Sequence, residues 1–129
     1  MQLDRIDHFN VRTTAREAEA VRDFYRDVLG LREGPRPAFS FPGHWMYLGD
    51  APVLHIAGAL PADTPAAAGT GRFDHVSFRA RDAKAVQKEL DARGIAWRGT
   101  AVPGTELYQL FFHDPVGMKV ELTFYDGAG

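Results

Sequence analysis

The chain has no cysteine among its 129 residues, which excludes disulfide bridges, thiolate zinc sites and cysteine nucleophiles. It also has no excess of positive charge, because 15 Lys and Arg residues stand against 17 Asp and Glu residues. Proteins that bind nucleic acid usually carry a clear basic excess. No apolar run approaches the ~20 residues that span a bilayer, and residues 1–7 lack the apolar segment of a secretory signal. We therefore expect a cytoplasmic protein without a nucleic-acid or membrane partner.

Nucleotide-binding and serine-nucleophile motifs are absent as well. The sequence contains no G-x-G-x-x-G, no P-loop and no G-x-S-x-G pattern, so nucleotide cofactors and a serine nucleophile have no support. Its 45% hydrophobic and 25% charged residues are ordinary for a globular protein and exclude wholesale disorder. The length suits one domain with a core of its own.

The sequence repeats itself. A shift of 67 residues places Ile6–Arg12 on Phe73–Arg79, and a shift of 66 places Val53–Ile56 on Lys119–Leu122. The type and polarity of the residues match at nearly every position, which indicates a duplicated module. We expect a single domain over residues 1–129. It comprises a first module at 1–58, a linker rich in Pro, Gly and Ala at 59–71, and a second module at 72–129.

Each module is predicted to have the order β-α-β-β-β in an α+β fold. The first helix, at 15–29, begins with the T-x-x-E capping box of Thr14 and Glu17 and stops at Gly30. The second helix is predicted to begin after Asp82 and to stop at Gly94. The predicted strands cover residues 4–11, 31–33, 38–48 and 52–57 in the first module and residues 73–79, 95–102, 107–112 and 118–124 in the second.

Four side chains with metal-binding chemistry occupy related positions in the two modules: His8, His55, His75 and Glu121. Because side chains alternate along a strand, each points away from the apolar residues beside it. If the strands curl, all four line one cavity. An unpaired Glu121 in an apolar strand would cost several kcal/mol in desolvation, and a divalent cation removes that cost. Ordinary half-exposed strand residues are the alternative interpretation, and the repeated positions argue against it.

Other polar and aromatic residues have less specific interpretations. Aromatic residues spaced by two form either a substrate-binding wall or part of the core: Phe39, Phe41, Trp45 and Tyr47. Arg12 and Arg79 are interpreted as surface charges at strand ends, and His44 and His113 as exposed histidines beside turns.

The segments IDHFNV, VLHIAG, FDHVSF and HDPVGMKVEL together resemble the vicinal oxygen chelate superfamily, which contains glyoxalases, bleomycin resistance proteins and extradiol dioxygenases. The most specific piece is the D-P-x-G turn at Asp114–Gly117, followed four residues later by Glu121. The resemblance covers essentially the whole chain and implies paired βαβββ modules that form half-barrels around a metal site. It implies that His8, His75 and Glu121 hold a divalent metal ion, preferably Fe²⁺, with Mn²⁺, Zn²⁺ or Ni²⁺ as alternatives. It further implies a small-molecule substrate with two adjacent oxygens and a homodimer.

The resemblance leaves the reaction open. Extradiol dioxygenases have a non-ligand histidine where this chain has His55, so the first hypothesis is a small extradiol-type dioxygenase. Its catalytic residues would be His55, as acid–base, and Tyr108, as a hydroxyl donor. The chain departs from those enzymes, because Phe111 replaces their usual tyrosine, Val102–Gly104 replaces an upstream histidine, and it has two modules where they generally have four.

Two other functions remain as alternatives. A glyoxalase-like lyase, isomerase or thiol transferase would use His55 as a fourth ligand or base, although glyoxalases usually have a carboxylate there. A metal-free drug-binding protein of the bleomycin-resistance type is the third hypothesis. Its counterparts usually lack the ligand set that this chain retains.

Overall fold

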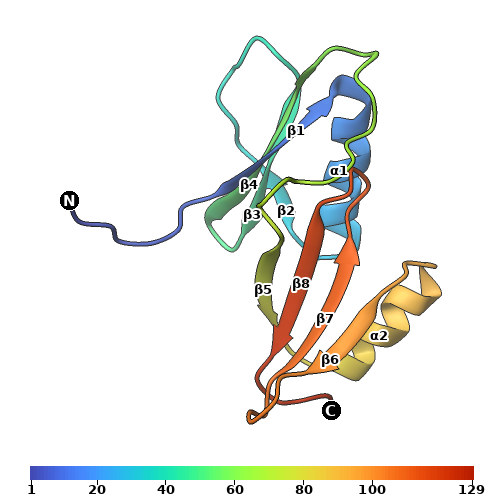
Figure 1. Cartoon of the computed structure of the whole chain (residues 1–129). Coiled ribbons are helices and arrows are strands. Elements are labelled where there is room, and N and C mark those ends of the chain that lie inside the picture. The colour runs from blue at the N-terminus through green and yellow to red at the C-terminus, as the bar shows by residue number, and fades with distance from the viewer. The chain divides into compact units, whose positions relative to one another are not determined.

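Each half of the chain folds into a four-stranded mixed sheet with one helix (Figure 1). The computed structural model describes residues 1–129, which divide into two units, Met1–Ala66 and Ala67–Gly129. The elements of the first unit are β1 (Phe9–Thr14), α1 (Ala15–Asp27), β2 (Arg32–Gly34), β3 (Gly43–Leu48) and β4 (Ala51–Leu60). Those of the second are β5 (Val76–Ala80), α2 (Ala83–Ala92), β6 (Arg98–Ala101), β7 (Tyr108–His113) and β8 (Lys119–Phe124). The predicted βαβββ order is confirmed in both.

The first unit is built on a sheet of order β1-β4-β3-β2, in which β1 runs parallel to β4 and the other pairs are antiparallel. The predicted capping box is present, since the Thr14 hydroxyl accepts from the Glu17 backbone N–H and the Glu17 carboxylate accepts from the Thr14 N–H. One face of α1 and one face of the sheet form the core, with these side chains buried: Ala18, Val21, Phe24, Tyr25, Met46, Leu54 and Ile56. Burying each large apolar side chain stabilises the fold by about 1.5–3 kcal/mol.

The second unit repeats this plan with a sheet of order β5-β8-β7-β6, again with one parallel pair, β5 and β8. Its core holds two residues of α2 and alternate residues of the two central strands: Ala83, Leu90, Leu110, Phe112, Val120, Leu122 and Phe124. Because side chains alternate along a strand, the residues between these core positions, Glu121 among them, lie on the opposite face of β7 and β8. Neither α1 nor α2 has the length and apolar character needed to cross a lipid bilayer.

Several predicted strand boundaries were wrong. The first strand begins at Phe9 instead of residue 4, because Phe9 pairs with Leu54 and the preceding residues would face Pro52, which has no N–H for a ladder. Similarly, β5 begins at Val76 instead of residue 73, since β8 starts only at Lys119. The strand predicted at 52–57 ends too early, because β4 continues to Leu60, which pairs with Thr14.

The turn at Asp114–Gly117 leads into β8, the strand that carries Glu121. Asp114 is 5% exposed, and its carboxylate Oδ1 accepts the backbone N–H groups of Val116 and Met118, each at 2.9 Å. The Gly117 N–H donates to the Asp114 carbonyl at 3.0 Å, and Gly117 has a φ of 86°, which glycine adopts without steric cost. These contacts fix the residue at which β8 begins.

Candidate functional site

Glu121 lies on the face of the second sheet opposite its core, and three side chains hold one of its oxygens. It is 4% exposed. Ser77 Oγ donates to Glu121 Oε1 at 2.7 Å, Gln109 Nε2 donates to it at 3.0 Å, and the Thr123 hydroxyl donates to the same oxygen. Hydrogen bonds of this kind fix the orientation of a buried carboxylate. Oε2 remains for another partner.

His75 supplies that partner. It directly precedes β5, and its Nε2 lies 3.0 Å from Glu121 Oε2. Its Nδ1 donates to Asp74 Oδ2 at 2.7 Å, because an ionised carboxylate can only accept. Lys119 Nζ also contacts Asp74 Oδ2, at 2.7 Å. The hydrogen bond from His75, followed by that from Lys119, lowers the pKa of Asp74.

The His75–Glu121 pair fits a divalent cation. A neutral His75 with its proton on Nδ1 turns the lone pair of Nε2 toward Oε2, and two acceptors 3.0 Å apart require a positive centre, either a proton or a metal ion. An imidazole nitrogen and a carboxylate oxygen are both ligands that divalent metal ions accept. A histidine ligand typically donates its other ring N–H to a carboxylate, as His75 does to Asp74. Neither unit alone brings three His, Asp or Glu side chains together.

The first unit repeats part of this arrangement. His8 directly precedes β1, and its Nδ1 donates to Asp7 Oδ2 at 2.7 Å. That hydrogen bond lowers the pKa of Asp7. The Asp-His pair is therefore present in both modules, and in each the carboxylate contacts Nδ1 and leaves Nε2 for another partner.

His55 stands where the second unit has Glu121, within a stack of rings. Its centroid lies 3.8 Å from that of His8 and 3.9 Å from that of Trp45, at interplanar angles of 19° and 3°. His55 Nε2 is buried without a hydrogen-bond partner. Burial, followed by the charge of His8, lowers the pKa of His55, so its imidazole is neutral at pH 7. An orphaned buried nitrogen costs about 1–3 kcal/mol, so this ring nitrogen is a polar group that the first unit leaves unsatisfied.

Three of the four predicted substrate-wall residues lie together. The rings of Phe39 and Phe41 stack at 5.2 Å, and Trp45 lies 6.5 Å from Phe39. The ring of Tyr47 instead contacts Arg32, and its hydroxyl donates to the Pro35 carbonyl at 2.5 Å. Phe39 is 46% exposed and Phe41 and Trp45 are partly exposed, so none of the three belongs to the fully buried core.

The structure argues against a role for Tyr108 beside Glu121. Tyr108 pairs with Phe124, which is fully buried, whereas Phe111 pairs with Glu121. Residues 108 and 111 therefore point to opposite faces of the sheet. The Tyr108 hydroxyl accepts from Gln87 on α2 at 3.3 Å. This predicted catalytic residue belongs to the packing of α2, because the register of β7 turns it away from the carboxylate.

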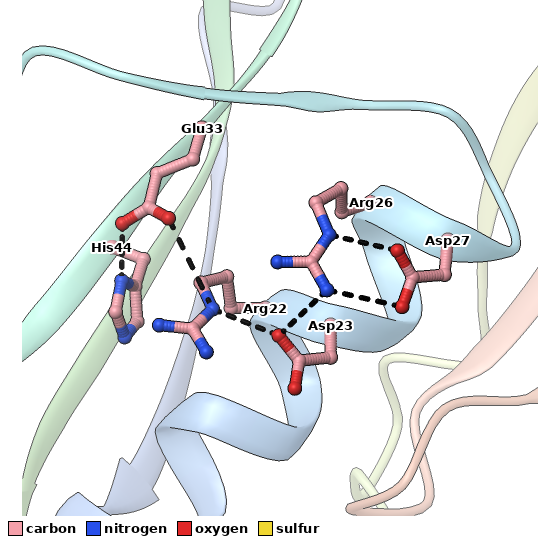
Figure 2. Close-up of polar contacts among 6 residues, drawn as sticks. All are labelled: Arg22, Asp23, Arg26, Asp27, Glu33 and His44. Carbon is pink, nitrogen blue, oxygen red and sulfur yellow. Dashed lines mark hydrogen bonds and ion pairs between the residues drawn. The ribbon is translucent and has the colours of Figure 1, made fainter.

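His44 is not the exposed turn residue that was predicted. It lies in β3 with its side chain 15% exposed, and its Nδ1 donates to Glu33 Oε1 at 2.6 Å. Figure 2 shows Glu33 bridging His44 to Arg22 of α1, beside the ion pairs that Asp23, Arg26 and Asp27 form along the helix. His44 thus serves a surface network, on the face opposite His55. His113, at the end of β7, is exposed as expected.

Several site residues escaped the sequence reasoning. Ser77, Gln109 and Thr123 hold Glu121, and Asp7 and Asp74 orient the two histidines. The repeated Asp-His dipeptide was a usable signal for the last two. Ser77 and Thr123 also follow His75 and Glu121 by two residues, which places them on the same face.

Three comparisons relate the chain to known proteins. A model of the Glyoxalase/Bleomycin resistance protein/Dioxygenase superfamily matches residues 5–122. Glyoxylase I 4 of Arabidopsis thaliana is 31% identical over 130 residues, which cover 95% of this chain and 71% of that protein. A glyoxalase family protein from Bacillus anthracis superposes with a TM-score of 0.75 at 24% identity, covering 96% of this chain and 97% of that one. Lactoylglutathione lyase from Agrobacterium tumefaciens superposes with a TM-score of 0.72 at 21% identity, covering 98% of this chain and 97% of that one.

Proposed function

Because the chain belongs to the glyoxalase/bleomycin resistance protein/dioxygenase superfamily, we propose that it is a metal-dependent enzyme acting on a small substrate with two adjacent oxygens. Among the reactions of the group, we propose a glyoxalase-like lyase or isomerase reaction. The curated relative at 31% identity is a glyoxylase I, and Tyr108, the candidate hydroxyl donor of the dioxygenase hypothesis, lies on the face of the sheet opposite Glu121. The reaction is then a proton transfer and consumes no oxygen.

The main support for the proposal is that hydrogen bonds hold the Glu121 carboxylate in one orientation. Glu121 Oε1 accepts three hydrogen bonds, and Oε2 faces His75 Nε2 at 3.0 Å. Three donors on one oxygen of a buried acid are the support expected for a metal ligand. We propose His75 and Glu121 as ligands, with His8, which has the same Asp-His device, as the third. Of these three residues, His8 belongs to the first unit and His75 and Glu121 to the second.

His55 is the proposed acid–base. A bound divalent cation would polarise the substrate oxygens and make the adjacent C–H group more acidic. His55 has a lowered pKa, so at neutral pH its imidazole is a free base that takes a proton at Nε2 and returns it to the neighbouring carbon. Stacking between His8 and Trp45 holds the ring in place during both transfers.

The proposal is tested by metal analysis followed by two assays. Purified protein is reconstituted with Fe²⁺, Mn²⁺, Zn²⁺ or Ni²⁺, and its metal content is measured. It is then given the thiohemiacetal of methylglyoxal and glutathione, and, separately, catechol in an oxygen electrode. Isomerisation without oxygen uptake supports the proposal. Oxygen consumption with catechol would favour ring cleavage instead, and protein that takes up none of the metals would be a metal-free binding protein.

Replacing the proposed base separates proton transfer from metal binding. We expect His55→Gln to lower kcat by about 10²–10⁴-fold, since general acid–base catalysis contributes that much, while the metal content stays unchanged. His44→Gln is the matched control, because His44 pairs with Glu33 on the other face of the same sheet. A variant at His55 that also loses its metal would make His55 a fourth ligand.

The partner of the ligand histidine has a measurable role of its own. We expect Asp74→Asn to weaken metal binding by about 10–100-fold, because a neutral amide no longer supports the charge on His75. Asp7→Asn should act similarly if His8 is a ligand. Chelator competition measures both, and Asp23→Asn, on the surface of α1, should leave the affinity unchanged.

We also propose that the protein forms a homodimer, as the two-module resemblance implies. Sedimentation velocity should show a species of twice the mass of one chain. A monomer at all concentrations would contradict this.

A further inference from the structure

The face of the second sheet that carries Glu121 continues into a basic pocket. Ser77 pairs with Glu121 and Arg79 with Thr123, so alternation places Arg79 on the same face, two residues beyond the metal ligand. Tyr125 follows Thr123 by two residues, and the Arg79 guanidinium carbon lies 4.4 Å from the centre of its ring.

A cavity of about 170 Å³ opens at this end of β5 and β8. Its lining is Arg79, Ala80, Arg81, Tyr125 and Asp126. Pockets that hold whole drug-sized ligands measure about 300–1,000 Å³. This cavity is therefore large enough for one end of a ligand and too small for all of it.

The charges of the pocket favour an oxyanion. Two guanidinium groups and one carboxylate line it, which leaves a net charge of one positive unit. Neither Arg79 nor Arg81 forms an ion pair or a hydrogen bond through its side chain within the chain. Stacking on Tyr125 fixes the plane of the Arg79 guanidinium and leaves its N–H edge free for bidentate contact with a carboxylate or phosphate.

The first module has no such pocket residues. By the repeat, Arg12 corresponds to Arg79, but Thr14 stands at the place of Arg81 and Ala59 at that of Tyr125. The side chains that line the pocket occur together only in the second module. The pocket is therefore not a mere consequence of the duplicated fold.

We propose that Arg79 and Arg81, with Tyr125, form an oxyanion subsite that binds the acidic end of the substrate. The assignment rests on the proposed function, since the other end of that substrate would reach Glu121. Two residues along a strand span about 7 Å, and Arg79 stands two residues past Ser77, the partner of Glu121. The substrate class is then a small molecule with two adjacent oxygens at one end and a carboxylate or phosphate at the other.

The subsite is tested first without metal. Isothermal titration calorimetry with benzoate and with inorganic phosphate should give saturable binding to the wild type. Arg79→Gln should weaken it by about 10-fold or more, since a hydrogen bond to a charged group is worth about 1.5–3 kcal/mol. Arg12→Gln, the equivalent change in the first module, should leave it unchanged. Tighter binding of benzoate or of phosphate identifies the preferred acid. No saturable binding, or equal losses in both variants, would overturn the proposal.

A second titration connects the subsite to the metal. With metal-loaded protein, 3,4-dihydroxybenzoate should bind more tightly than catechol, and Arg79→Gln should abolish that preference without changing the affinity for catechol. An equal preference in the variant would refute the assignment. If the protein binds no metal, the proposed function fails while the benzoate and phosphate titrations still judge the pocket. If metal binds but neither benzoate nor phosphate shows saturable binding, the proposed subsite is wrong and the proposed function still stands.

Discussion

Glu121→Gln should lower the affinity for the metal by more than about 100-fold, because even the outer partners of a ligand contribute 10–100-fold. The amide keeps the shape of the side chain and still accepts hydrogen bonds from Ser77 and Thr123 through its oxygen. It replaces the anionic Oε2 that faces His75 with a neutral group. Metal content after dialysis, together with chelator competition, measures the loss.

The control for this variant is Glu89→Gln. Glu89 lies on α2 of the same unit and pairs with Arg93 at 3.0 Å on the surface, so its loss should leave metal binding intact. An unchanged urea-unfolding midpoint in Glu121→Gln would show that the fold survives. Retention of wild-type affinity in that variant would remove Glu121 from the ligand set and with it the main support for the proposed function.

Asp114→Ala should destabilise the second unit by about 2–4 kcal/mol. The change leaves the N–H groups of Val116 and Met118 without their acceptor, and each buried unsatisfied donor costs about 1–3 kcal/mol. Asp114→Asn should cost less, since the amide oxygen still accepts. Urea denaturation followed by the fluorescence of Trp97, which lies in the second unit, reports the shift.

Asp63→Ala provides the comparison for Asp114. Asp63 is exposed between the modules, and surface changes of this kind usually alter stability by less than about 0.5 kcal/mol. Equal midpoints for the two alanine variants would mean that the turn before β8 does not depend on the Asp114 carboxylate.

The repeat and strand alternation predicted the most about this protein. They predict that His75 and Glu121 share one face, and in the structure the Nε2 and Oε2 atoms of these residues lie 3.0 Å apart. Thr14, Glu17 and Gly30 predicted the start and end of α1, because capping and a left-handed residue depend on local chemistry alone.

What the sequence could not supply was the pairing between strands. The face of Tyr108 depends on the register of β7 against β8, and a shift of one residue reverses every side chain. The start of β1 depends on Pro52, which lies far away in the sequence. The hydrogen bond from Gln109 to Glu121 also depends on the register between strands, since it joins β7 to β8.

The occupied Oε1 of Glu121 also has a consequence for ion selectivity. With three donors on that atom, a metal ion bound at Glu121 would have a single oxygen, Oε2, available to it. Calcium takes six to eight oxygen ligands and often a chelating, two-oxygen carboxylate, so this denticity and the imidazole nitrogen discriminate against it. If Glu121 is a ligand, the hydroxyl groups of Ser77 and Thr123 therefore favour other divalent ions over calcium by occupying Oε1.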